Sequence, residues 1–195
     1  MTIVGVSIIL SAALMAGPCL ARGIGESTQS DAPMEQLMPP DIPVTDANGR
    51  TDGFVALLAP RGPVIISFFY TSCLSLCDVT NAILYGVDQD VRESGGDPIT
   101  LVSLSIDPMN DTPTALKDNA EPFKPSENWL WLTAGWRGTD PLLDGLGTSF
   151  DSIFSHDPMF LVGDFCSSRF TRVIGLPEPE FLIALARKVP ECGES

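Results

Sequence analysis

The chain has few basic residues. Its 195 residues include 11 Lys and Arg against 25 Asp and Glu, which gives a formal net charge of −14. No basic stretch is dense enough to follow a phosphate backbone, so we expect no nucleic-acid partner. A solvated acidic surface that maintains solubility is favoured over a surface that binds cations or basic proteins.

Histidine and cysteine are also scarce, with one His and five Cys in the chain. Structural zinc takes four nitrogen or sulfur ligands, so a chain with a single histidine fits it poorly. The cysteines are too few for a scaffold built from disulfides, and a hydrophobic core must therefore hold the fold. The length suits one domain, and no internal repeat is present.

A segment without charged side chains occupies residues 3–20, "IVGVSIILSAALMAGPCL". It is marginal as a membrane span and more typical of a signal peptide. We favour cleavage after Ala21 or Gly23; the alternatives are a retained inner-membrane anchor and a lipoprotein at Cys19, against which Pro18 argues. Each of these routes exports the domain, so we expect a periplasmic protein that is either soluble or anchored.

Residues 24–41 are rich in Ser, Gln, Asp, Met and Pro and have no periodicity. This composition predicts a flexible tether. We therefore assign residues 1–23 to a signal peptide or membrane anchor, 24–41 to the tether and 42–195 to the domain.

The domain alternates strand and helix patterns. Asn48-Gly49 tolerates the positive φ angles of a type I′ turn, which predicts a β-hairpin within residues 42–58. Apolar runs predict strands at 61–70, 98–106, 128–134, 158–164 and 169–175. Helical spacing and capping signals predict helices at 77–94, 111–123, 139–150 and 177–189. This order predicts an α/β sandwich with a mixed central sheet flanked by helices and an N-terminal hairpin.

Cys73 and Cys77 follow the predicted core strand in the stretch "FFYTSCLSLC". If a helix begins near Cys73, the separation of four places both sulfurs on one face with α-carbons about 6 Å apart, within reach of a disulfide. A helix N-terminus favours thiolate over thiol. A purely structural bridge that closes so short a loop would constrain the unfolded chain little. We therefore predict a reversible dithiol.

The single histidine, His156, directly precedes the predicted strand 158–164. A lone histidine is more often a surface or hydrogen-bonded structural residue. Its loop, however, is expected at the sheet edge that carries Cys73 and Cys77. Two thiolates select Cu(I), and an added imidazole allows the site to accept Cu(II) as well. We predict a copper site with three ligands.

Three stretches resemble the Sco/SenC family, thioredoxin-like proteins that handle copper for cytochrome oxidase assembly. "FFYTSCLSLC" resembles the Phe-x-Tyr-Thr-x-Cys-x-x-x-Cys stretch of that family, and the resemblance continues in "VSLSIDPMNDTPTALKDNAEPF" and "HDPMFLVGD". It runs from about residue 40 to 188. It implies a thioredoxin-like fold, Cys73, Cys77 and His156 as copper ligands, and a membrane tether with the domain facing the periplasm.

Two features depart from the family pattern: the residue after the second cysteine, and the spacing from His156 to "FLVG", which is about one residue shorter than in the family. Asp78 follows the second cysteine where the family usually has proline; its carboxylate either joins the helix cap or adds negative charge beside the sulfurs, which disfavours thiolate. Pro158 is a candidate for a thioredoxin-type cis-proline facing the cysteines. In that arrangement His156 is displaced from the ligand position, so its ligation stays a hypothesis.

Four further residues are candidates near the site or for a second disulfide. Asp107 and Asp111 form either an acidic lip or, as we favour, a turn after the strand and a helix cap, respectively. Cys166 and Cys192 either pair as a second disulfide, which we slightly favour, or remain accessory thiols.

Two functions follow from the predicted site. The first is a metallochaperone that passes copper by ligand exchange to the apo copper subunit of a cytochrome oxidase or to another periplasmic copper or thiol protein. The second is a thiol–disulfide oxidoreductase in which Cys73 and Cys77 are the catalytic pair and reduce cysteines of a partner metalloprotein. The protein is an enzyme only if it has the second of these two functions.

Overall fold

The computed structural model describes residues 33–73, 76–150, 152 and 157–190. Within these ranges an eight-stranded mixed sheet has the order β1-β8-β7-β4-β5-β6-β2-β3. The strands are β1 (Met34–Gln36), β2 (Pro43–Asp46), β3 (Thr51–Gly53), β4 (Val64–Phe69), β5 (Thr100–Ser105), β6 (Trp129–Thr133), β7 (Met159–Asp164) and β8 (Arg169–Ile174). The helices are α1 (Phe54–Leu58), α2 (Leu76–Ser94), α3 (Pro113–Ala120), α4 (Gly135–Gly145) and α5 (Pro179–Ala186), with 3-10 turns at Ala59–Arg61 and Glu121–Phe123.

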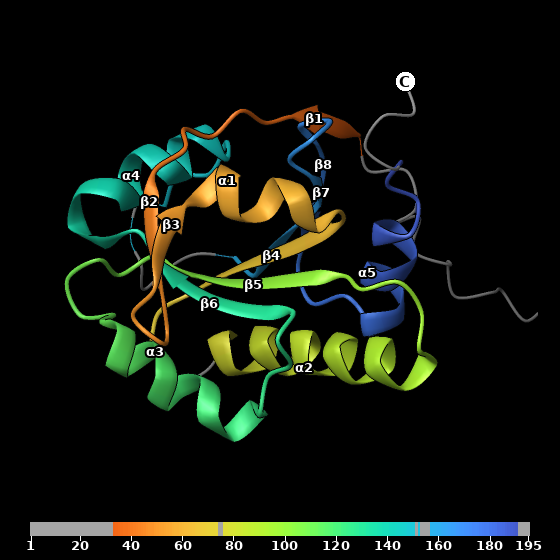
Figure 1. The fold of residues 1–195 in the computed structure, drawn as a ribbon, viewed down its shortest axis with the longest axis horizontal. Coiled ribbons are helices and arrows are strands. Elements are labelled where there is room, and N and C mark those ends of the chain that lie inside the picture. Colours follow the sequence, from red (N-terminus) through yellow and green to blue (C-terminus); the bar gives the residue numbers. More distant parts are fainter. Residues whose placement is uncertain (1–32, 74–75, 151, 153–156, 191–195) are drawn as a thin grey trace, which may run out of the picture. The chain divides into compact units, whose positions relative to one another are not determined.

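Helices cover both faces of the sheet (Figure 1): α2 and α3 lie on one side, and α1 and α4 on the other. Helix α5 packs beside α2. The predicted α/β sandwich with a mixed sheet and an N-terminal hairpin is confirmed. No helix in the described ranges is long and apolar enough to cross a membrane.

Strands β4 and β5 form the centre of the sheet, and every residue of both is buried. They pair in parallel from Val64 opposite Thr100 to Phe69 opposite Ser105, and β6 continues the parallel arrangement beside β5. Continuous β-branched and apolar runs suit strands that are covered on both faces. The carboxyl ends of β4, β5 and β6 therefore meet at one edge, where the chain after β4 reaches the cysteines.

The helical spacing of Val79, Ile83, Val87 and Val91 predicts an apolar stripe on α2, but the buried face of the helix differs from it. Val79 is 40% exposed, whereas the helix buries three polar side chains, Thr80, Asn81 and Asp88. Each has at least one hydrogen bond, which offsets part of the cost of burial, although Asn81 Nδ2 has no partner among the described residues. For example, the Ser103 hydroxyl donates to Asn81 Oδ1 (3.0 Å), and the Ser126 amide donates to Asp88 Oδ2 (3.1 Å). The spacing of apolar residues alone does not predict this buried face, because polar side chains that are hydrogen-bonded can be buried as apolar ones are.

The hairpin of β2 and β3 is present, but its turn is not type I′. Gly49 has φ +80°, whereas Asn48 is not among the residues with positive φ. The Asp46 side chain accepts the backbone N–H groups of Asn48 and Arg50 at 2.8 and 2.9 Å. This side-chain bonding fixes a turn in which only the glycine is left-handed.

The segment directly after the hairpin forms α1. Asp41 Oδ1 accepts the backbone N–H groups of Val55 and Ala56 (2.8 and 3.1 Å). These are among the donors that a helix N-terminus leaves unpaired. A carboxylate outside the helix thus stabilises its first turn.

Part of the predicted tether belongs to the sheet. Strand β1 pairs antiparallel with β8, from Met34 opposite Thr171 to Gln36 opposite Arg169, and Leu37 is buried. Residues 1–32, including the predicted signal peptide, lie outside the described residues, so their assignment stays a prediction.

An ion pair fastens β1 to β8. Arg172 donates Nε–H to Glu35 Oε1 (3.1 Å) and Nη2–H to Glu35 Oε2 (2.8 Å). The hydrogen bond and charge of Arg172 lower the pKa of Glu35 from its ordinary value of 4.5, although partial burial opposes the shift. A lowered folded-state pKa stabilises the fold above the unfolded-state pKa, and this stability is lost as pH falls through the folded-state value.

Replacing Glu35 with Gln is therefore expected to lower the free energy of unfolding at pH 7 by about 0.5 kcal/mol, a small effect because the pair is partly exposed. Urea unfolding should show the difference from wild type shrinking towards pH 3. Glu127→Gln, which changes an exposed acid, is the matched control and should show no such pH dependence. An equal difference at both pH values would contradict a role for the ion pair.

Candidate functional site

The structure joins Cys73 and Cys77 in a disulfide between the turn after β4 and the first turn of α2. Their α-carbons are 5.9 Å apart, which agrees with the separation predicted from helical spacing. Helix α2 begins at Leu76, close to the predicted start at residue 77. The backbone N–H of Cys77 donates to Cys73 Sγ (3.3 Å), so the first sulfur lies at the N-terminus of α2, where unpaired N–H groups favour a thiolate.

The two cysteines differ in their surroundings. Cys77 is buried, at 3% exposure, whereas Cys73 is partly buried and packs against the edge of the core. The Thr80 hydroxyl donates to the carbonyl of Cys77 (3.0 Å). Cys77 is thus fixed in the helix, and Cys73 is the sulfur closer to solvent.

Cys73 closes a tight turn after β4. Its backbone N–H donates to the carbonyl of Tyr70 (3.1 Å). Thr71, inside this turn, donates its hydroxyl to Asp111 Oδ1 (2.5 Å) and directs its backbone N–H to both carboxylate oxygens (3.1 and 3.2 Å). The Ser105 hydroxyl donates to Asp111 Oδ2 (2.6 Å). The turn that carries Cys73 is therefore held by the loop that follows β5.

The two aspartates of "SIDPMNDTP" do not form the alternative acidic lip. Asp107 shapes the turn after β5, because its carboxylate accepts the backbone N–H groups of Met109 (3.2 Å) and Asn110 (3.3 Å). The expectation for Asp111 is wrong: Thr112 caps α3 by accepting the N–H of Ala115 (3.3 Å). Asp111 is instead buried. Asp111 directly precedes the helix cap Thr112, so the sequence could single out this carboxylate. Its hydrogen-bond partner Thr71 lies 40 residues earlier in the chain, and no local pattern connects the two.

Two predicted cysteine and histidine partners cannot be placed. His156 and Cys192 lie outside the described residues, so histidine ligation and the Cys166–Cys192 pairing stay predictions. Cys166 is exposed and takes no part in the Cys73–Cys77 disulfide. Among described residues no group of three or more His, Cys, Asp or Glu side chains is arranged to hold a metal ion.

Asp78 and Pro158 lie within the described residues, whereas His156, from which the shorter spacing is counted, does not. The expected cis-proline at Pro158 is wrong, since the described residues contain no cis peptide bond. Asp78 lies exposed in the first turn of α2. A carboxylate at that position interacts favourably with the helix dipole.

Two exposed apolar side chains follow the strands that end at the same sheet edge as β4. Met109, in the loop after β5, is 77% exposed, and Trp136, at the start of α4 after β6, is 65% exposed. Both follow strands whose carboxyl ends share the edge with the turn after β4. Trp136 lies mainly at the surface, whereas Trp129 and Trp131 are buried.

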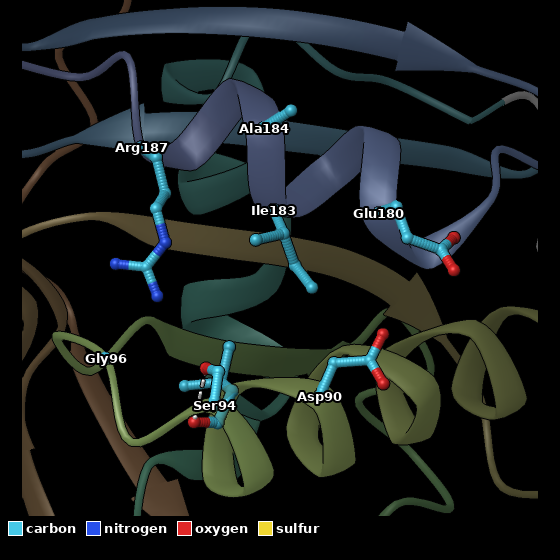
Figure 2. Close-up of a pocket in the computed structure, with 8 residues that line it drawn as sticks. Asp90, Ser94, Gly96, Glu180, Ile183, Ala184 and Arg187 are labelled. Carbon is cyan, nitrogen blue, oxygen red and sulfur yellow. Dashed lines mark hydrogen bonds between the residues drawn. The ribbon is translucent and has the colours of Figure 1, made fainter.

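The described pockets lie away from the cysteines. One, of about 420 Å³, lies between the second half of α2 and α5, with Asp90 and Glu180 at one end and Arg187 near Gly96 at the other (Figure 2). Asp90 is about 20 Å along the helix from Cys77 at 1.5 Å per residue. A second pocket, of about 1040 Å³, includes Arg61 and Asn128 at the amino ends of β4 and β6. Neither Cys73 nor Cys77 lines either of these two pockets.

The geometry defines a thioredoxin-like domain with a CxxxC disulfide at the start of the helix that follows its central strand. The SCO1/SenC family model matches residues 59–158, which is more than half of the chain. The chain therefore belongs to the SCO1/SenC family, as the resemblance of its motifs predicted. The comparison with curated proteins finds no match.

Solved Sco structures have the same fold. Yeast Sco1 with copper bound is 16% identical, with 83% of this chain and 99% of that chain covered and a TM-score of 0.65. BsSco, described as having a disulfide switch and belonging to the Sco family of cytochrome c oxidase assembly proteins, is 19% identical (78% and 96% covered, TM-score 0.60). A SCO1/SenC family lipoprotein from Bacillus anthracis is 20% identical (79% and 96% covered, TM-score 0.65). These likenesses confirm the thioredoxin-like fold.

Proposed function

We propose that this protein is a copper metallochaperone that binds copper through Cys73, Cys77 and His156. It delivers the metal to the apo copper subunit of a cytochrome oxidase. The observation that carries the proposal is the CxxxC pair at the N-terminus of α2, with α-carbons 5.9 Å apart, in a member of the SCO1/SenC family. Yeast Sco1 and Bradyrhizobium japonicum ScoI, both described with copper bound, support it.

Copper loading requires the reduced pair. A dithiol donor supplies two electrons and two protons, which convert the Cys73–Cys77 disulfide to two thiols while the donor becomes a disulfide. Cu(I) then displaces the two thiol protons and binds the two thiolates, its preferred ligand type. The imidazole of His156 adds a third ligand and extends the site to Cu(II). Because Cys73 is partly exposed, a ligand of the recipient has access to the metal for exchange.

The test is an anaerobic titration of the reduced full-length protein with Cu(I) and Cu(II). We expect one equivalent of each to bind, and Cu(II) to produce sulfur-to-copper charge-transfer absorption. No binding of either ion in the reduced state would overturn the proposal.

The same titration on His156→Ala tests the third ligand. Copper affinity should fall by more than about tenfold, since second-shell changes alone cost 10- to 100-fold. Thiol exchange should be little affected, which serves as the internal control. Unchanged Cu(II) affinity and absorption would remove His156 from the site.

A thiol–disulfide oxidoreductase is the second candidate, and the unequal exposure of the two cysteines favours it. In this function the Cys73 thiolate attacks a partner disulfide and releases one partner thiolate, which takes up a proton. Cys77, deprotonated, then attacks Cys73 Sγ, forms the observed disulfide and releases the second partner thiol. The partner gains two electrons and two protons. Thiol exchange without copper binding would support this candidate.

We also propose that the domain acts on the outer side of a membrane. The uncharged segment at residues 3–20 supports export, either with cleavage or with retention as an anchor. The Bacillus anthracis relative is described as a lipoprotein. Fractionation of cells that express the full chain would locate it in the soluble periplasm or at the inner membrane.

A further inference from the structure

We infer that Asp111 is a positioning residue that sets the balance between the disulfide and dithiol states of Cys73 and Cys77. It does so through the turn Tyr70–Cys73 and touches neither sulfur. The copper part of this inference rests on the function proposed above, whereas the thiol part does not.

The first step is the burial of a carboxylate among neutral donors. Asp111 is 3% exposed and accepts hydrogen bonds from the Thr71 hydroxyl, the Thr71 backbone and the Ser105 hydroxyl at 2.5 to 3.2 Å. The ion pairs of the described residues, Arg50–Asp46, Arg92–Asp88 and Arg172–Glu35, do not include Asp111. Hydrogen bonds to a carboxylate are shorter and stronger than bonds between neutral groups. The carboxylate therefore fixes the donors around it.

The second step is what those donors control. Thr71 is the second residue of the turn that the N–H of Cys73 closes on Tyr70. Ser105 is the last residue of the buried strand β5 and its hydroxyl also accepts the N–H of Asp107 (3.2 Å). Asp111 thus connects the turn that carries Cys73 to the buried centre of the sheet.

The third step concerns the two sulfurs. Cys77 is buried in α2, so its position depends on packing of the helix and not on the turn. Cys73 is positioned by the turn. A group that restricts the turn lowers the entropy lost when the two sulfurs join each other or a common metal ion. Loss of this restriction should therefore weaken both the disulfide and Cu(I) binding.

The variants separate the charge, the hydroxyl and the fold. Asp111→Asn removes the charge and one acceptor in nearly the same shape, and Thr71→Val removes only the hydroxyl donor. Thr71→Ser keeps the hydroxyl and should restore wild-type behaviour. Asp118→Asn is the matched control, because it makes the same change at an exposed position of α3.

The measurement is equilibration of the full-length chain in glutathione buffers, with alkylation and peptide mapping of Cys73 and Cys77. Two glutathione thiols pass two electrons and two protons to the pair and become glutathione disulfide. Asp111→Asn should shift this equilibrium about tenfold towards the dithiol, or about 30 mV, and Thr71→Val about threefold. Thr71→Ser and Asp118→Asn should remain within about twofold of wild type on the same scale.

A purely structural role predicts a different pattern. It would lower the free energy of unfolding of the oxidised and reduced proteins equally and leave the glutathione equilibrium unchanged, which would overturn the inference. If Asp111→Asn does not fold, the Thr71→Val variant tests the inference instead: a glutathione equilibrium equal to that of wild type would also overturn the inference.

Cu(I) affinity, measured by chelator competition, should fall about tenfold in Asp111→Asn. If wild type binds no Cu(I), the proposed function fails while the glutathione result still tests Asp111.

Discussion

Replacing Cys77 with serine is expected to weaken Cu(I) binding by about a thousandfold, equivalent to about 4 kcal/mol. Cu(I) selects soft sulfur ligands, and a serine hydroxyl is a hard, protonated oxygen that replaces one of the two proposed thiolates. Serine is close to cysteine in size, so the first turn of α2 should form as before. Competition with a chromophoric Cu(I) chelator under anaerobic conditions measures the affinity.

The control for this substitution is Cys166→Ser. Cys166 is exposed and outside the disulfide, so its replacement should leave Cu(I) affinity unchanged. Circular dichroism and urea unfolding of both variants separate a lost ligand from a lost fold. Cu(I) affinity retained in Cys77→Ser, or lost in Cys166→Ser, would place the metal elsewhere.

Replacing Phe69 with alanine is expected to lower the free energy of unfolding by about 3–5 kcal/mol, the usual cost of truncating a buried Phe. Phe69 is fully buried and its ring meets Trp131 edge-on, with centroids 5.0 Å apart. Its carbonyl also accepts the N–H of Ile106 (2.9 Å). The substitution leaves a cavity directly before the turn that carries Cys73, and urea unfolding measures its cost.

Trp136→Ala is the matched aromatic control. Trp136 is mainly exposed, and its ring lies 4.6 Å from the guanidinium carbon of Arg137. Loss of this cation–π contact should cost no more than about 1 kcal/mol. Similar losses in both variants would show that the core at the end of β4 is less well packed than its burial indicates.

The centre of the fold was predictable from the sequence because burial there is nearly complete. Strands β4 and β5 consist of runs that leave no solvent-facing position, and such runs have few other stable conformations in a domain of this size. The helix after the cysteines ends at Ser94, directly before Gly95 and Gly96, as the glycines predicted. In these segments local sequence and burial favour the same structure.

The edges of the fold were less predictable. Strand β1 has three residues, too few to show alternation, and it depends on β8 for its hydrogen bonds. Helix α1 begins where Asp41 caps it from 14 positions earlier in the chain. Both elements depend on partners outside their own sequence window, so no local pattern indicates them.

The candidate site was likewise only partly predictable from the sequence. The separation of Cys73 and Cys77 was predictable because helix geometry fixes the distance between residues four apart. The contact of Thr71 with Asp111 was not, since it joins two motifs 40 residues apart. The parallel pairing of β4 and β5 brings these motifs together, and only the three-dimensional structure shows which carboxylate meets which turn.

The pairing of β1 with β8 also limits how far an anchored domain can travel. If residues 1–23 remain in the membrane, the segment that connects this anchor to the sheet comprises residues 24–33 and not the predicted 24–41, because the sheet begins at Met34. At about 3.5 Å per extended residue its contour length is at most about 35 Å, compared with about 63 Å for the longer segment. The domain would then search about a third of the area, close to the bilayer. If the predicted anchor is retained, such a short reach suits a recipient embedded in the same membrane.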